Sequence, residues 1–140
     1  LSGVPESLPP LLKAYRMQDK ARAVGFDWEE RGQVWDKVKE ELAEFHAELD
    51  QTLSDPTDAQ ARAKAEGEFG DVLFSIVNAG RLYDLNPDTA LERTCAKFRR
   101  RFTYLEEHTI RQGRDLKDMT LAQMDEIWDE AKALEKEGKL

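Results

Sequence analysis

Apolar and charged residues follow one another along most of the chain with the period of an α-helix. Apolar positions recur three and four residues apart, which places them on one helix face at roughly 3.6 residues per turn. No segment keeps the two-residue alternation that is typical of a half-buried strand. The pattern therefore predicts an all-α protein with five helices.

Residues that favour helix ends divide this pattern into segments. Gly25 is expected to end the first helix, and Asp27 is expected to cap the second. Residues 1–8 are expected to form a linker, followed by a single domain over residues 9–140. The expected helices run from Pro9 or Pro10 to about Val24, from Trp28 to about Leu53, from Thr57 or Asp58 to about Tyr83, from Pro87 (after Asn86) to about Ile110, and from Thr120 (in a capping box with Gln123) to about Glu137.

The second and third expected helices each carry a charged stripe with the same spacing. A lysine is followed four residues later by an acid, and a further acid comes three residues after that. These positions share one helix face, so the carboxylates of each stripe point the same way. The stripes are Lys37, Glu41, Glu44 and Glu48 in the second helix, and Lys64, Glu68, Asp71, Ser75 and Asn78 in the third.

An apolar stripe lies next to each charged one, so the acids are expected to border the core. Two such helices packed antiparallel would gather four carboxylates into a metal site. A solvated acidic face is the alternative, because paired acids are common on charged helices, and Glu126 and Asp129 repeat the spacing. The apolar stripes are Val34, Val38, Leu42, Phe45 and Leu49, and then Phe69, Val72, Ile76 and Ala79.

The fourth expected helix carries the basic run KFRRRF beside its own apolar stripe. Lys97 and Arg101 are four residues apart and share a face, and an arginine fork can bind two phosphate oxygens. The run is therefore either a phosphate clamp or a basic surface patch. The apolar stripe contains Leu91, Cys95, Phe98, Phe102 and Leu105, and Cys95 is expected to pack there.

Composition narrows the function classes. The chain has 140 residues, a net charge of −8 and 36% charged residues, which disfavours non-specific binding to nucleic acid. It contains one cysteine and shows no signal-peptide pattern, no membrane-length apolar run and no glycine-rich phosphate loop. We therefore expect a cytoplasmic protein without a membrane partner. The chain begins at Leu1, and we expect it to be a piece of a longer protein.

Two other classes of helical protein share parts of this pattern. A di-iron carboxylate bundle needs Glu-x-x-His pairs, but Ala43 and Leu105 stand three residues before the two histidines. This class is therefore rejected. A non-catalytic interaction or regulatory bundle with solvated acidic faces stays open as the alternative function.

Several segments, in order along the chain, resemble the MazG family of nucleoside triphosphate pyrophosphohydrolases. They are LLKAYRMQDKARAVGFDWE at 11–29, EELAE at 40–44, EFGDVLFSIVN at 68–78, ALERTCAKFRRRF at 90–102 and MTLAQMDEIWDEAK at 119–132. The first resembles the opening of the second, catalytic copy in two-copy members, so the resemblance implies a further MazG-type domain before this one. It also implies a four-helix-bundle-like all-α fold with an additional helix, and a homodimer.

The same resemblance implies Mg²⁺-dependent cleavage of a nucleoside triphosphate to the monophosphate and pyrophosphate, with Mn²⁺ as a substitute metal. The family's metal-binding and catalytic acids correspond to Glu41, Glu44, Glu68 and Asp71. Its nucleotide-binding residues correspond to Lys37, Lys64, Lys97, Arg101 and Trp128.

Gly67 departs from the family pattern. Many members carry an acid at this position, directly before the glutamate of E-x-x-D, so the departure puts the number of metal ions in doubt. Among the four acids, Glu44 is our candidate for the general base that takes a proton from the attacking water.

Overall fold

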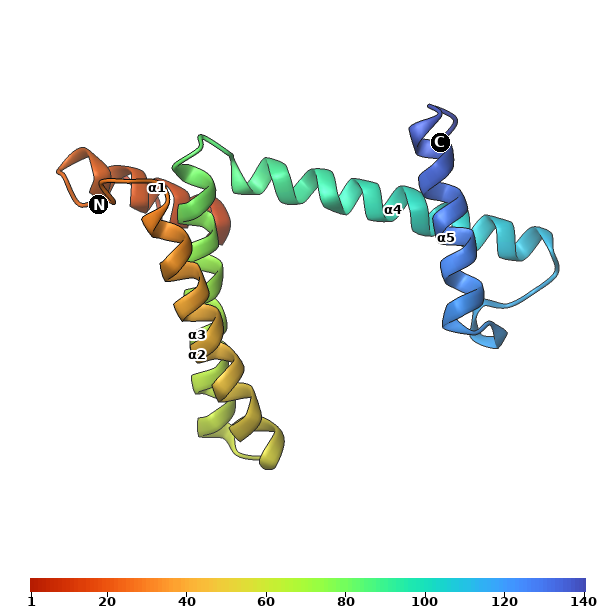
Figure 1. Ribbon diagram of the computed structural model, residues 1–140, viewed down its shortest axis with the longest axis horizontal. Coiled ribbons are helices and arrows are strands. Elements are labelled where there is room, and N and C mark those ends of the chain that lie inside the picture. The colour runs from red at the N-terminus through yellow and green to blue at the C-terminus, as the bar shows by residue number, and fades with distance from the viewer. The chain divides into compact units, whose positions relative to one another are not determined.

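The computed structural model describes all 140 residues, and every regular element in it is helical. The predicted all-α class is therefore confirmed. None of the helices combines the length and apolar composition needed to cross a membrane. The elements are α1 (Pro10–Ala23), α2 (Gln33–Ser54), α3 (Ala59–Arg81), α4 (Pro87–Arg111), the short 3₁₀ helix η1 (Leu116–Asp118) and α5 (Leu121–Lys136) (Figure 1).

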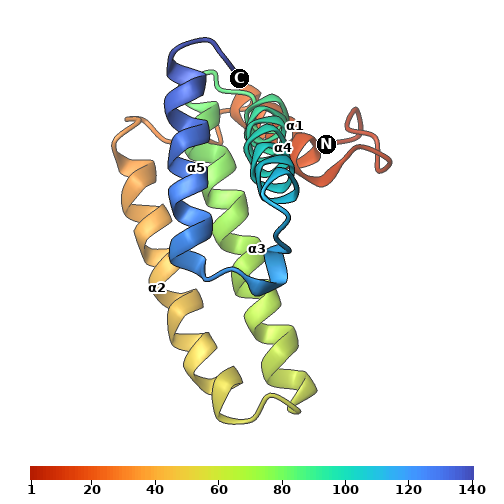
Figure 2. The ribbon, with the colours of Figure 1, turned by 90° about the vertical axis from the view of Figure 1, so that its right-hand side faces the viewer.

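The chain divides into two compact units, Leu1–Ala90 and Leu91–Leu140, and each is described by itself. In the first unit, α2 and α3 form an antiparallel hairpin and lie side by side along their length (Figures 1 and 2). Helix α1 also packs against α3. The expectation of one domain over residues 9–140 stays a prediction.

Apolar contacts between α2 and α3 follow the predicted stripes in part. The rings of Phe45 and Phe69 stack with their centroids 5.2 Å apart, which joins the two stripes. Val34 on α2 and Val72 and Ala79 on α3 are buried. Leu42 and Ile76, in contrast, leave about half of their surface exposed, at 52% and 48%. The hairpin therefore has a narrow apolar contact, with polar residues close to it.

Most predicted helix ends are confirmed by the capping contacts. Asp58 accepts hydrogen bonds from the backbone N–H groups of residues 60 and 61, and Asn86 accepts one from Thr89 N–H. Thr120 and Gln123 form the predicted capping box. Gly25 has φ +89°, a left-handed conformation that suits glycine at a helix C-terminus.

The predicted start of the second helix is wrong. Helix α2 begins at Gln33 instead of Trp28, and the N-cap position is Gly32, which makes no side-chain cap. The reason is a long-range ion pair: Asp27, the expected cap, lies with Oδ1 2.7 Å from Nη2 of Arg81 on α3. Residues between α1 and α2 therefore form a non-helical segment, which this ion pair attaches to α3.

The second unit contains α4 from Leu91 onward, η1 and α5, around a small core. Leu105, Met119 and Ile127 form its buried centre, with Tyr104 and Met124 packed against it. The rest of the apolar stripe on α4 is not covered: Phe98 is 58% exposed, and Cys95 is exposed, so the expected packing of Cys95 is wrong.

The capping box gives a test of the second unit. Thr120→Ala removes the hydroxyl that accepts from Gln123 N–H at 3.1 Å. We expect the free energy of unfolding, measured in urea, to fall by about 1 kcal/mol. Thr120→Ser keeps the hydroxyl and should lose much less. Equal losses in the two variants would show that the cap does not stabilise α5.

Candidate metal and phosphate site

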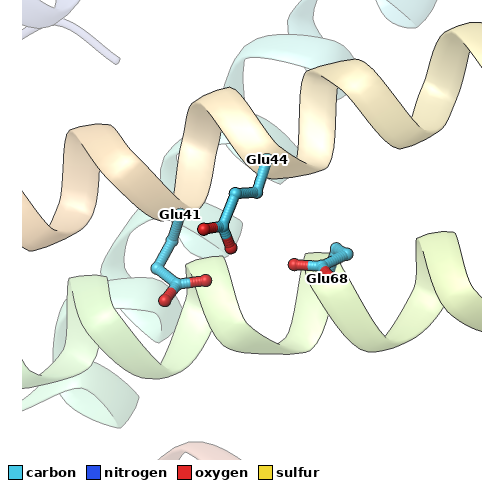
Figure 3. A group of neighbouring side chains, drawn as sticks. All are labelled: Glu41, Glu44 and Glu68. Carbon is cyan, nitrogen blue, oxygen red and sulfur yellow. The ribbon is translucent and has the colours of Figure 1, made fainter.

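Three of the four predicted metal-binding acids lie together on the facing helices of the hairpin. Glu41, Glu44 and Glu68 each offer a carboxylate oxygen, and these atoms all lie within 4.8 Å of one another. Figure 3 shows Glu41 and Glu44 leaving α2 toward α3, with Glu68 reaching toward them from α3. We call these three residues the carboxylate cluster. The two stripes therefore meet, as their spacing predicted.

Asp71, the fourth predicted ligand, does not belong to the carboxylate cluster. It is exposed, and it lines a neighbouring cavity of about 610 Å³ together with Lys37 and Glu41. The carboxylate cluster and the cavity therefore share Glu41, and Asp71 lies on the cavity side of the site.

Burial makes the carboxylate cluster unusual for a charged surface. Glu41 is only 8% exposed, and Oε2 of Glu41 and Oε2 of Glu68 are buried without any hydrogen-bond partner. Buried polar atoms are normally paired, because an unpaired one loses its contact with water and gains nothing. Carboxylate oxygens are the ligands that hard divalent cations prefer. The donor set and its unpaired oxygens therefore fit a metal ion.

The negative charges in the cluster also act on one another. The pKa of Glu44 is raised, first by the charge of Glu41, then by partial burial and by the charge of Glu68. Each of these effects makes the ionised form of Glu44 less favourable. A bound cation would remove this penalty.

Two of the three predicted nucleotide-binding lysines, Lys37 and Lys64, are held by acids of α2. Lys37 Nζ lies 2.8 Å from Oε1 of Glu41, a hydrogen bond that raises the pKa of Lys37. Lys64 Nζ lies 2.9 Å from Oε1 of Glu48, which raises the pKa of Lys64 in the same way. The first pair follows from spacing within one helix. The second crosses from α3 to α2, a contact that the spacing within each stripe does not predict.

The other predicted nucleotide contacts lie in the second unit. Arg101 donates to Glu135 from Nε at 3.0 Å and from Nη2 at 2.8 Å, and its guanidinium carbon lies 5.7 Å from the ring centroid of Trp128. Trp128 also packs on Phe98, with centroids 5.3 Å apart. Lys97 is exposed. Their place beside the carboxylate cluster stays a prediction.

Sequence reasoning missed several residues around these groups. Glu135 holds Arg101 from α5, and its pKa is lowered, chiefly by that hydrogen bond. Gln18 on α1 is buried and lines the cavity. Asp27 and Arg81, which form an ion pair, line the same cavity. No local pattern signals these roles, because each depends on a residue more than 30 positions away.

No family model matches the chain, but several individual proteins are similar to it in sequence. The nucleoside triphosphate pyrophosphohydrolase of Escherichia coli K12 is 37% identical over 135 residues, which cover 96% of this chain and 49% of that protein. The nucleoside triphosphate pyrophosphohydrolase/pyrophosphatase MazG of Thermotoga maritima is 38% identical over 125 residues, covering 89% of this chain and 45% of its own length. The chain belongs to the MazG family.

A shorter match extends the comparison. This MazG-family chain is 49% identical over 71 residues to the uncharacterized protein YabN of Bacillus subtilis, covering 51% of the chain and 14% of that protein. The chain spans about half the length of the two enzymes named above, at 49% and 45%. The matches to these two enzymes therefore extend over nearly all of this chain but over only about half of each enzyme.

The Arg101–Glu135 contact predicts a pH dependence of stability. Because the pKa of Glu135 lies below its usual value of 4.5, the contact stabilises the fold above that pH and is lost as the pH falls through the lowered pKa. Glu135→Gln should therefore unfold at a lower urea concentration than the parent at neutral pH. We expect the difference to shrink once the pH is well below 4.5.

Glu126→Gln, an exposed position on the same helix, is the matched control and should show little difference at any pH. A gap between the parent and Glu135→Gln that stays constant down to acid pH would contradict the interpretation.

Proposed function

We propose that this chain hydrolyses nucleoside triphosphates to the monophosphate and pyrophosphate, with Mg²⁺ (or Mn²⁺ in its place) held by the carboxylate cluster and Asp71. The observation that carries the proposal is the close approach of three carboxylates with two buried, unpaired oxygens. The relatives from E. coli and T. maritima bear the name of this reaction, which supports the reaction class.

The three acids of the carboxylate cluster divide into metal ligands and a general base in the proposed reaction. When bound, Mg²⁺ supplies positive charge for the phosphates and makes a coordinated water more acidic. Glu41 and Glu68 have the buried, unpaired oxygens and are the main ligands in this proposal. Glu44 is the exposed member of the carboxylate cluster and has no buried, unpaired oxygen, so it is the cluster acid least committed to the metal and our candidate for the general base.

Basic residues complete the proposed phosphate site. Lys37 and Lys64 are held by Glu41 and Glu48 and bring positive charge close to the acids, where they steady the phosphates. In Arg101, Nε and Nη2 are engaged by Glu135, so Nη1 is the atom offered to a phosphate oxygen. Lys97 adds charge on the same helix face.

Trp128 is the proposed stacking contact for the face of the nucleobase. Stacking on an aromatic ring tolerates every base, which would suit a broad or housecleaning specificity. The competing interpretation, that Trp128 only packs, draws support from its contacts with Phe98 and Arg101.

The alternative function, a non-catalytic interaction or regulatory module, requires that the acidic stripes face bulk water. Burial of Glu41 and of the Glu68 Oε2 atom speaks against it. We also propose a cytoplasmic location, no binding of nucleic-acid polymers, and a second MazG-type domain before this one in the full-length protein.

The acids give the direct test of this proposal. In Glu41→Gln, Glu44→Gln, Glu68→Gln and Asp71→Asn we expect turnover of nucleoside triphosphates to fall by roughly a hundredfold or more, because metal-based charge stabilisation is worth several kcal/mol. The metal-free variants should be as stable as the parent or more stable, since like charges no longer repel. The rise in melting temperature on adding Mg²⁺ should shrink in each.

Glu126→Gln and Asp129→Asn are the matched controls, because this pair repeats the E-x-x-D spacing on α5 at exposed positions. Their turnover should stay close to that of the parent. The proposed function falls if the variants of Glu41, Glu44, Glu68 and Asp71 retain parental turnover, or if the control pair proves equally sensitive.

We further propose that the active form is a homodimer. Helix α4 exposes Leu91, Phe98 and Phe102 by 50%, 58% and 37%, and Trp35 on α2 is 46% exposed. Covering such side chains with a second copy would remove apolar surface from water. Light scattering at micromolar concentration should give about twice the monomer mass, or four times it for a dimer of dimers. A monomer mass would refute the proposal.

A further inference from the structure

The charged stripe on α3 does not stop at the carboxylate cluster. It continues from Asp71 through Ser75 to Asn78, and all three residues line the 610 Å³ cavity of the first unit. Asp71 and Asn78 are separated by roughly two helical turns, or about 10 Å along the axis. One end of the cavity therefore lies at the acids, and the other lies a nucleoside's length away.

The walls of the cavity suit a flat, partly apolar ligand. Phe26 and Trp28 line it from the segment between α1 and α2, and Phe74 lines it from α3. Its volume, about 610 Å³, falls in the range of small-molecule sites, roughly 300–1,000 Å³. Aromatic side chains with a few polar groups among them are typical of such sites.

Gln18 lines this cavity and carries an unsatisfied hydrogen-bond acceptor. Its Nε2 donates to the backbone carbonyl of Phe74 at 2.9 Å. Because a carbonyl oxygen only accepts, this contact fixes which end of the amide is the donor. The other end, Oε1, is buried and has no partner, and Gln18 as a whole is only 7% exposed. A ligand N–H group is the partner that this atom lacks.

Asn78 presents the complementary donor. Its Oδ1 accepts from Arg81 at 3.0 Å from Nε and at 2.9 Å from Nη2. A guanidinium only donates, so the orientation of this amide is fixed as well, and Nδ2 is the atom left for a ligand. Arg81 is itself held by Asp27 at 2.7 Å. The orientation of the Asn78 amide is therefore fixed by a partly buried ion pair.

We propose that this cavity holds the nucleoside part of the triphosphate, and that Gln18 Oε1 and Asn78 Nδ2 hydrogen-bond to the edge of its base. The inference rests on the proposed function, since the phosphates would lie at the carboxylate cluster. Each common base has an N–H donor next to an acceptor on its pairing edge. This pair of amides therefore adds affinity for a base without requiring one particular base.

Binding measurements separate this inference from the proposed function. Calorimetry in Mg²⁺ compares two probes, a non-hydrolysable nucleoside triphosphate analogue and inorganic tripolyphosphate, which has no base. In the parent, both should bind, and the nucleotide analogue should bind more tightly. Gln18→Met removes the acceptor and should weaken binding of the analogue by roughly five- to a hundredfold. The Kd of tripolyphosphate should change much less.

A second variant tests the other amide, so that the inference can still be judged if Gln18→Met fails to fold. Asn78→Asp keeps an oxygen for Arg81 but replaces the donor Nδ2 with an acceptor, and it should also lose preference for the nucleotide over tripolyphosphate. Gln51→Met, at an exposed position on α2, is the matched control and should leave both Kd values close to those of the parent.

The outcomes are distinct. Selective weakening of the nucleotide analogue in Gln18→Met and Asn78→Asp supports the inference. Equal weakening of both probes, or no change in either, overturns it and leaves the proposed function standing. Failure of the parent to bind either probe overturns the proposed function and the inference with it.

Discussion

Burial of like charges between α2 and α3 is the constraint on which the rest of this site depends. Glu41 and Glu68 approach each other from facing helices, and each keeps a buried oxygen without a partner. Apolar contacts oppose this repulsion: Phe45 stacks on Phe69, and Val34 and Val72 are buried. The hairpin therefore holds carboxylates together that would separate in water, as a cation site requires.

Two lysines bring compensating positive charge close to the acids, and their positions decide which carboxylate oxygens stay unpaired. Lys37 bonds Glu41 within α2, while Lys64 bonds Glu48 across the hairpin. Neither lysine forms a hydrogen bond with the unpaired Oε2 atoms of Glu41 and Glu68. The local charge is thus only partly neutralised, which leaves the acids able to bind a metal ion.

The ion pair between Arg81 and Asp27 shapes the neighbouring cavity, again because a buried charge needs a partner of opposite sign. Arg81 is buried, and a buried guanidinium is tolerated only when its charge is paired. Asp27 supplies that pairing and in doing so attaches the segment with Phe26 and Trp28 to α3. One electrostatic requirement therefore sets the aromatic wall of the cavity and the orientation of the Asn78 amide.

The sequence by itself determined the helical class, most helix ends and the two stripes that carry the carboxylate cluster. These features depend on residues within about four positions of one another, as at Asp58 and Thr120, where capping is local. Only the tertiary structure decided that Asp27 leaves the start of α2 for Arg81, and that Gln18 faces the cavity. Such contacts depend on the register of packed helices, which no local pattern contains.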